Sequence, residues 1–243
     1  MDIYSKPDLY DALHKNYNAD NRFIFSIAKK IGAPVLELAA GTGRLASGIL
    51  DLGFKYTGID ISRDFIKVAK QTYPHNAEFF CADMRSFNLK KKFKFIFIGF
   101  NSFLHLYNKK EAIRCLKSVK KHMGNGGVFL ISIFIPDPSF LYRTKNKLYP
   151  ATDVFDFNGD KCQFMEKNKY NSETQVNSLK WYLKRNDKIE KEEYCFELRM
   201  FYPHEMDIII NKAGLMIKKK YGDYNFSPLN SDSSLQIYLC ERT

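Results

Sequence analysis

The chain has 243 residues, 45% of them hydrophobic and 27% charged, with a formal net charge of +11. This length and composition fit one large folded domain and exclude a disordered chain. The apolar runs are too short to span a bilayer, the N-terminus has no apolar signal core, and the five cysteines show no paired spacing, so we expect a cytoplasmic protein without a disulfide framework or zinc site.

Two helical patterns open the chain, within residues 1–34. Residues 8–17 are loosely amphipathic. Asp20 then stands where it could cap a helix with one apolar face, which we expect to end at Gly32.

Strands and helices are expected to alternate through residues 35–135. Helical spacing separates short apolar runs, the pattern typical of a parallel sheet that is covered on both faces. The expected strands are 35–38, 56–59, 79–81, 93–100 and 128–134, and the expected helices are 45–52, 62–72 and 109–122.

The pattern changes at Pro136. Residues 136–202 include runs of period two, which predict antiparallel strands in an insertion that covers the substrate. A last helix from Pro203 to Gly214 and strands at 215–221 and 235–240 complete the pattern. We therefore expect one α/β domain over residues 1–243, with a Rossmann-like sheet at 35–135 and 203–243.

A glycine-rich turn, ELAAGTGR, joins the first strand to the next helix. Alone it is also compatible with a dinucleotide site or with a plain tight turn. Glu37 favours a different ligand, because its carboxylate would repel a pyrophosphate but attract an ammonium. Asp60 and Asp83 end the next two strands, where they could bind ribose hydroxyls and an adenine amino group.

With ELAAGTG, YTGIDIS, CADMRSF and the GNGG turn, the sequence resembles class I S-adenosylmethionine-dependent methyltransferases. The resemblance covers about 35–135 and 203–241. It implies a seven-stranded sheet with an antiparallel last strand, helices on both faces, and S-adenosyl-L-methionine as cofactor. The cofactor-binding residues that we assign are Glu37, Ala39, Gly41, Gly43, Asp60, Ile61, Asp83, Met84 and Phe100.

The expected fourth strand runs into Asn101-Ser102-Phe103-Leu104-His105, at the sheet edge where reacting groups gather. His105 could accept a proton from the methyl acceptor, or it could simply pack beside the next helix. NSFLHL resembles the same segment of sugar-amine and glycine N-methyltransferases. That resemblance implies that Tyr17 assists His105.

We assign Asn101 and Tyr202 to substrate binding, although Tyr202 could instead pack over the last helix. The glycine enzymes that the segment resembles hold a carboxylate with an arginine near the end of the fifth strand. Residues 131–136 contain no arginine, which argues against glycine as the acceptor.

The positive charge is unevenly distributed. Residues 137–200 carry 12 basic and 11 acidic side chains, so the excess lies in the rest of the chain. This favours a small-molecule acceptor over the alternative of an RNA methyltransferase. The resemblance to N-methyltransferases implies methylation at nitrogen rather than oxygen. We expect a monomer or homodimer with no membrane partner. Residues 137–160 should be mobile without ligand, and acceptor contacts should come from 137–200 and the Tyr17 region.

Overall fold

The computed structural model describes all residues from 1 to 243, in two compact units. Unit 1 comprises Met1–Tyr17 and Pro136–Met200, and unit 2 comprises Asn18–Ile135 and Phe201–Thr243. The two N-terminal helical patterns thus fall into different units. No helix is both long and apolar enough to cross a bilayer.

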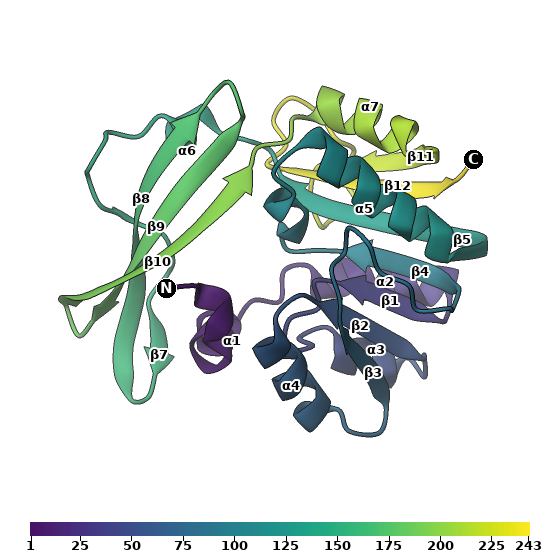
Figure 1. Cartoon of the computed structure of the whole chain (residues 1–243), viewed down its shortest axis with the longest axis horizontal. Coiled ribbons are helices and arrows are strands. Elements are labelled where there is room, and N and C mark those ends of the chain that lie inside the picture. The colour runs from purple at the N-terminus through teal and green to yellow at the C-terminus, as the bar shows by residue number, and fades with distance from the viewer. The chain divides into compact units, whose positions relative to one another are not determined.

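Unit 2 contains a seven-stranded sheet (Figure 1). All its strands run parallel except β12, which is antiparallel to both of its neighbours, so the predicted fold class and antiparallel last strand are confirmed. The strands, in order across the sheet, are β11 (Leu215–Tyr221), β12 (Leu235–Arg242), β5 (Met123–Phe134), β4 (Phe93–Ile98), β1 (Val35–Leu38), β2 (Tyr56–Asp60) and β3 (Ala77–Cys81).

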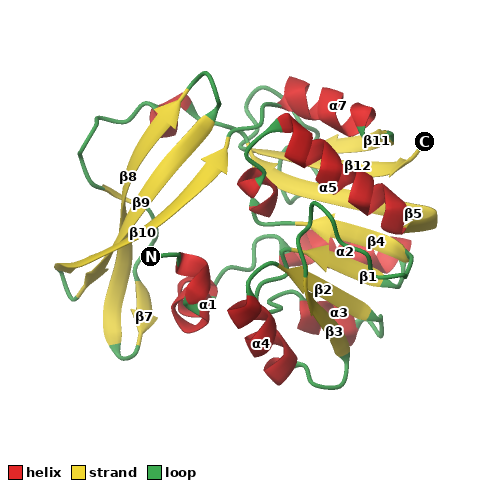
Figure 2. Cartoon of the chain, in the orientation of Figure 1, coloured by secondary structure: helices red, strands yellow, loops and turns green.

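Helices cover both faces of this sheet (Figure 2). On one face, α2, α3 and α4 share a single apolar cluster with inward side chains of the strands, including Phe95 and Phe97. On the other face α5 and α7 contact each other. The helices are α2 (Asn21–Ile31), α3 (Ala46–Asp51), α4 (Arg63–Thr72), α5 (Lys109–His122) and α7 (Pro203–Lys212), with a short 3-10 helix, η2 (Ser102–His105), after β4.

Two local expectations need correction. The Asp20 side chain makes no capping hydrogen bond to α2, because both of its carboxylate oxygens accept from Arg44 instead. The GNGG segment does not precede its strand but belongs to it: β5 begins at Met123, and the register between Phe93 and Phe95 shifts at this point. β5 therefore enters the sheet through a glycine-rich bulge.

Unit 1 is built on an antiparallel sheet, as the period-two pattern predicts. Ile3, Leu9, Phe164 and Tyr194 belong to its apolar core, against which Trp181 packs. Its elements are η1 (Ile3–Ser5), α1 (Pro7–His14), α6 (Pro138–Leu141), β6 (Tyr149–Pro150), β7 (Phe155–Phe157), β8 (Asp160–Asn171), β9 (Val176–Arg185) and β10 (Lys188–Arg199).

Candidate active site

The glycine-rich turn follows β1 at the carboxyl edge of the unit 2 sheet. Its backbone is left-handed at Ala39, Gly41 and Gly43, with φ values of 54°, 57° and 89°. A side chain at Gly43 would lie 3.0 Å from the rings of Phe79 and Tyr73, so both conformation and packing require glycine there. The turn is thus fixed by its sequence in a tight conformation.

Glu37 lies near the end of β1 and is 7% exposed. The Tyr56 hydroxyl donates a hydrogen bond of 2.6 Å to Glu37 Oε2. Burial raises the pKa of the Glu37 carboxyl to about 8, against the smaller opposing effects of the Tyr56 hydrogen bond and the Arg44 charge. The site therefore holds a carboxyl group that lacks a cation close enough to keep it ionised at neutral pH.

Asp60 ends β2 and braces the glycine-rich turn. Its two carboxylate oxygens accept hydrogen bonds from the backbone N–H groups of Gly41, at 2.9 Å, and Ser62, at 2.8 Å. Burial raises its pKa, and these backbone donors partly offset the effect. The next side chain, Ile61, is apolar yet 67% exposed. An acid and an exposed apolar surface thus stand side by side at the strand end.

Asp83 follows β3 and is held by a neighbouring arginine. Arg85 donates to both Asp83 oxygens, through Nε at 3.0 and 2.9 Å and through Nη2 at 2.7 Å, and so lowers the pKa of Asp83. Arg85 also bonds Glu111, at the start of α5, at 2.9 Å. Asp83 is therefore held at this edge and is already charge-paired, and Met84 beside it is half-buried.

Arg44 and Asp20 form a further charged pair that the sequence patterns did not single out. The guanidinium donates to both oxygens of the fully buried Asp20, at 2.9 and 2.6 Å, and stands 5.5 Å from the centre of the Phe100 ring. Its charge acts on Glu37. The sequence signal for this pair is the cation that directly follows Gly43 in the glycine-rich motif.

The chain leaves β4 through two consecutive left-handed residues, Phe100 and Asn101, with φ values of 51° and 64°. Asn101 Oδ1 accepts a hydrogen bond of 2.8 Å from the Phe134 N–H, which ties this loop to the end of β5. The loop leads directly into η2, which ends at the half-buried His105. His105 thus follows the carboxyl end of β4, as its position in the sequence predicts.

The remaining candidates are divided between the two units. Tyr202 precedes α7 in unit 2, where its ring stacks 6.2 Å from that of His204. Tyr17 is half-buried and is the last residue of the N-terminal segment of unit 1. The structure therefore gathers the assigned cofactor residues, His105, Asn101 and Tyr202 in one unit and places Tyr17 in the other.

These residues fit the cofactor that the resemblance implies. Glu37 is a buried carboxyl that a ligand ammonium would complete. The Asp60 oxygens accept backbone N–H groups and, with two lone pairs each, retain capacity for a ligand hydroxyl. The exposed side chain of Ile61 offers an apolar surface suited to a purine ring. Ammonium, ribose and adenine are the corresponding parts of S-adenosylmethionine.

Comparisons with known proteins agree with this architecture. Residues 35–127 match the family described as "Methyltransferase domain". A putative methyltransferase from Bacillus subtilis (strain 168), YqeM, is 21% identical over 97% of this chain and 95% of its own. A dTDP-3-amino-3,6-dideoxy-α-D-glucopyranose N,N-dimethyltransferase from Streptomyces fradiae is 26% identical over 51% of each chain.

Solved structures show the same fold over nearly the whole chain. The CcbJ methyltransferase from Streptomyces caelestis aligns with a TM-score of 0.82 at 20% identity, covering 100% of this chain and 98% of its own. CalS10, an amino pentose methyltransferase from Micromonospora echinaspora solved with S-adenosylmethionine bound, aligns with a TM-score of 0.74 at 17% identity over 97% of both chains. The matched residues, the sheet order and the acids at its carboxyl edge together identify a methyltransferase domain of the class I, S-adenosylmethionine-dependent kind in this chain, over residues 35–127.

Proposed function

We propose that the enzyme transfers the methyl group to an amine nitrogen of a small molecule, with amino sugars as the first class to test. The observation that carries this proposal is His105, half-buried directly after the carboxyl end of β4, on the sheet edge that also holds Glu37 and Asp60. The amino-sugar relatives support nitrogen as the acceptor atom. RNA is not favoured as the acceptor, since the two relatives whose names state a substrate, the dTDP-amino-sugar dimethyltransferase and CalS10, are both named for sugars.

The cofactor residues that we assign have separate tasks. Glu37 holds the ammonium, and Asp60 the ribose hydroxyls. Asp83 and Met84 face the adenine amino group, while Ile61 covers the ring. The turn formed by Ala39, Gly41 and Gly43, together with Phe100, allows close approach of the ligand. When bound, S-adenosylmethionine supplies an electrophilic methyl group on a sulfonium.

Catalysis by the protein then consists of orientation and proton handling. Asn101 and Tyr202 orient the acceptor, so that its nitrogen lone pair is aligned for bond formation as the carbon–sulfur bond breaks. His105 accepts the proton that the nitrogen gives up, and Tyr17 assists His105. Exclusion of water from the site strengthens these interactions.

We further propose that unit 1 contributes acceptor contacts. Its sheet carries a buried carboxylate, Glu166, which bonds Trp181 Nε1 at 2.8 Å and Arg143 at 2.9 Å. The near-neutral composition of 137–200 suits a small polar ligand better than a phosphate chain. We expect a cytoplasmic monomer or homodimer, which size-exclusion chromatography with light scattering tests.

The experiment is a methyl-transfer screen with isotopically labelled S-adenosylmethionine. Nucleotide-linked and unlinked amino sugars form one panel, matched hydroxy sugars a second, and transfer RNA a third. We expect label in amino sugars that is lost when the amine is replaced by a hydroxyl. Label in RNA alone, or equal label in amine and hydroxyl compounds, would overturn the proposal.

A further inference from the structure

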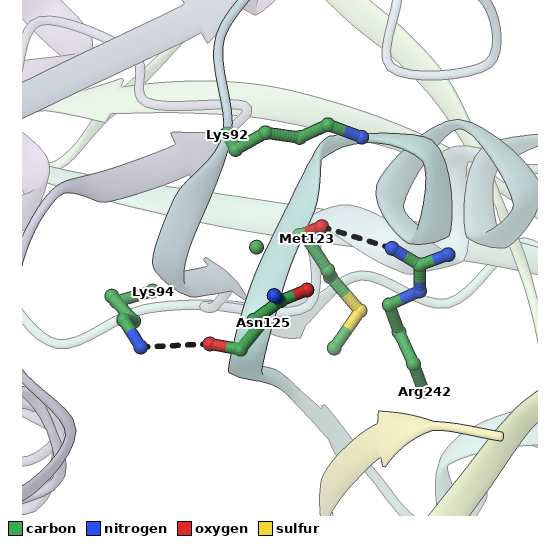
Figure 3. Close-up of a pocket in the computed structure, with 6 residues that line it drawn as sticks. Lys92, Lys94, Met123, Asn125 and Arg242 are labelled. Atoms are coloured by element: carbon green, nitrogen blue, oxygen red, sulfur yellow. Dashed lines mark hydrogen bonds between the residues drawn. The ribbon is translucent and has the colours of Figure 1, made fainter.

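A hollow of about 450 Å³ opens at the amino edge of the unit 2 sheet, the edge opposite Asp60 and Asp83. We call it the basic hollow, and Figure 3 shows the side chains around it. Lys92 precedes β4, Met123 begins β5, and Arg242 ends the antiparallel β12, so all three lie at the same edge. The lining residues are Lys92, Lys94, Met123, Gly124, Asn125 and Arg242.

Three cations of the basic hollow bond only to uncharged main-chain carbonyl oxygens. Lys92 Nζ donates to the oxygen of Lys121 at 2.6 Å, Lys94 Nζ to that of Asn125 at 2.7 Å, and Arg242 Nη1 to that of Met123 at 3.3 Å. An ammonium has three donors and a guanidinium five, so most of their hydrogen-bonding capacity is unused.

Charged residues next to two of these cations in the sequence form ion pairs, whereas the three cations of the hollow do not. Lys91 pairs with Glu78, and Glu241, next to Arg242, pairs with Lys218. No carboxylate lies within ion-pair distance of Lys92, Lys94 or Arg242. The hollow therefore concentrates positive charge that the protein itself leaves uncompensated.

The start of β5, with its glycine-rich bulge, contributes Met123, Gly124 and Asn125 to the lining of the hollow. Gly126 is left-handed, with φ of 63°, and a side chain at Gly127 would come within 2.9 Å of the carbonyl oxygens of Gly124 and Phe93. Asn125 and Gly126 are exposed.

We propose that the basic hollow binds a small phosphate-bearing anion, at a site separate from the methyl-transfer centre. A phosphate offers several acceptor oxygens and about two negative charges, which suit two ammonium groups and the fork of one guanidinium. The volume lies within the range of small-ligand pockets. A nucleic acid would instead need cations spaced along a track.

The test is calorimetric titration of the whole protein with inorganic pyrophosphate in about 50 mM salt, where surface charges are weakly screened. We expect one site, and at least a tenfold loss of affinity in the Lys92→Gln/Lys94→Gln variant. The matched control is Lys117→Gln/Lys212→Gln, which removes the same charge from exposed positions on α5 and α7 and should bind within twofold of the parent. Arg242→Gln serves as a second site variant if the double variant fails to fold.

Three outcomes would overturn the proposal. The parent could fail to bind pyrophosphate, or site and control variants could lose affinity equally, which would indicate diffuse net charge. A short single-stranded RNA could bind more tightly than pyrophosphate and depend on Lys92 and Lys94, which would make the hollow a nucleic-acid contact. Unchanged S-adenosylmethionine affinity in the site variants would support the separation of the two sites.

Discussion

Glu37 is expected to release a proton when the cofactor binds. Burial raises its pKa to about 8, so at pH 7 the carboxyl is mostly protonated. A bound ammonium favours the carboxylate, and binding at pH 7 should therefore release close to one proton. Affinity should rise with pH between about 6 and 7.5, by up to about tenfold per unit.

Calorimetry in two buffers with different ionisation enthalpies measures this proton release. Glu37→Gln should bind more weakly and release none. Cofactor binding by the parent without proton release would show that Glu37 does not meet the ammonium.

The same burial predicts that Glu37 destabilises the folded protein at alkaline pH. Its folded pKa, about 8, lies above the value of 4.5 that applies when the chain is unfolded. Between about pH 4.5 and pH 8 the Glu37 carboxyl ionises in the unfolded chain but stays protonated in the folded chain. The free energy of unfolding therefore falls progressively across this range. Glu37→Gln should raise the melting temperature at pH 8, by a stability gain of a few kcal/mol at most, and change it little at pH 4.5. An unchanged or lower melting temperature at pH 8 would contradict the raised pKa.

His105 is expected to affect turnover but not cofactor binding. If His105 is the base, the His105→Ala variant should have a kcat lower by a factor of about 10²–10⁴. The affinity for S-adenosylmethionine, which calorimetry measures, should stay within about twofold, because His105 lies outside the assigned cofactor set. Full activity in a folded His105→Ala variant would leave this residue only a packing role.

At the scale of elements, the loop after β4 depends on Asn101. Asn101 adopts a left-handed backbone, and its side chain accepts the Phe134 N–H. Asn101→Ala loses this bond and strains the backbone, so we expect a loss of about 1–3 kcal/mol in unfolding free energy. Asn101→Gly also removes the hydrogen bond, but glycine adopts the left-handed backbone without strain. Its unfolding free energy should therefore fall by only about 1 kcal/mol. Urea unfolding separates the two, and equal stability of Asn101→Ala and the parent would refute the role of the bond.

The sequence predicted the elements better than the contacts between them. Apolar runs predicted the central parallel strands because these are buried on both faces, as at 93–98, where Phe95 and Ile96 face opposite sides of the sheet. The edge strand β3 differs, since only Phe79 of its residues is buried. Asp20 was assigned to a helix cap on local grounds, since the pairing with Arg44, 24 residues away, has no periodic signal. The bulge that begins β5 was predicted as a turn, because glycine-rich sequences are typical of both turns and bulges.

At the scale of the whole molecule, the chain separates its expected tasks. Unit 2 contains every assigned cofactor residue and His105, whereas Tyr17 and the buried Glu166 belong to unit 1. Strand-end topology made the first group predictable from sequence. An antiparallel sheet has no edge at which all strands end at their carboxyl termini, so strand topology does not indicate where unit 1 would contact the acceptor. Those contacts stay a prediction.

The charge distribution predicts how acceptor binding responds to salt. Although the net charge is +11, residues 137–200 are almost neutral, and the basic hollow lies at the edge opposite the assigned cofactor residues. A small amine acceptor engages few charges, so its KM should change less than about tenfold between 50 and 200 mM salt, whereas six to ten phosphate contacts would cost about 10³–10⁵ in affinity. Steady-state kinetics across this range tests the expectation, with cofactor affinity measured in parallel. A steep dependence of acceptor KM, together with competition by RNA, would instead assign the positive surface to substrate binding.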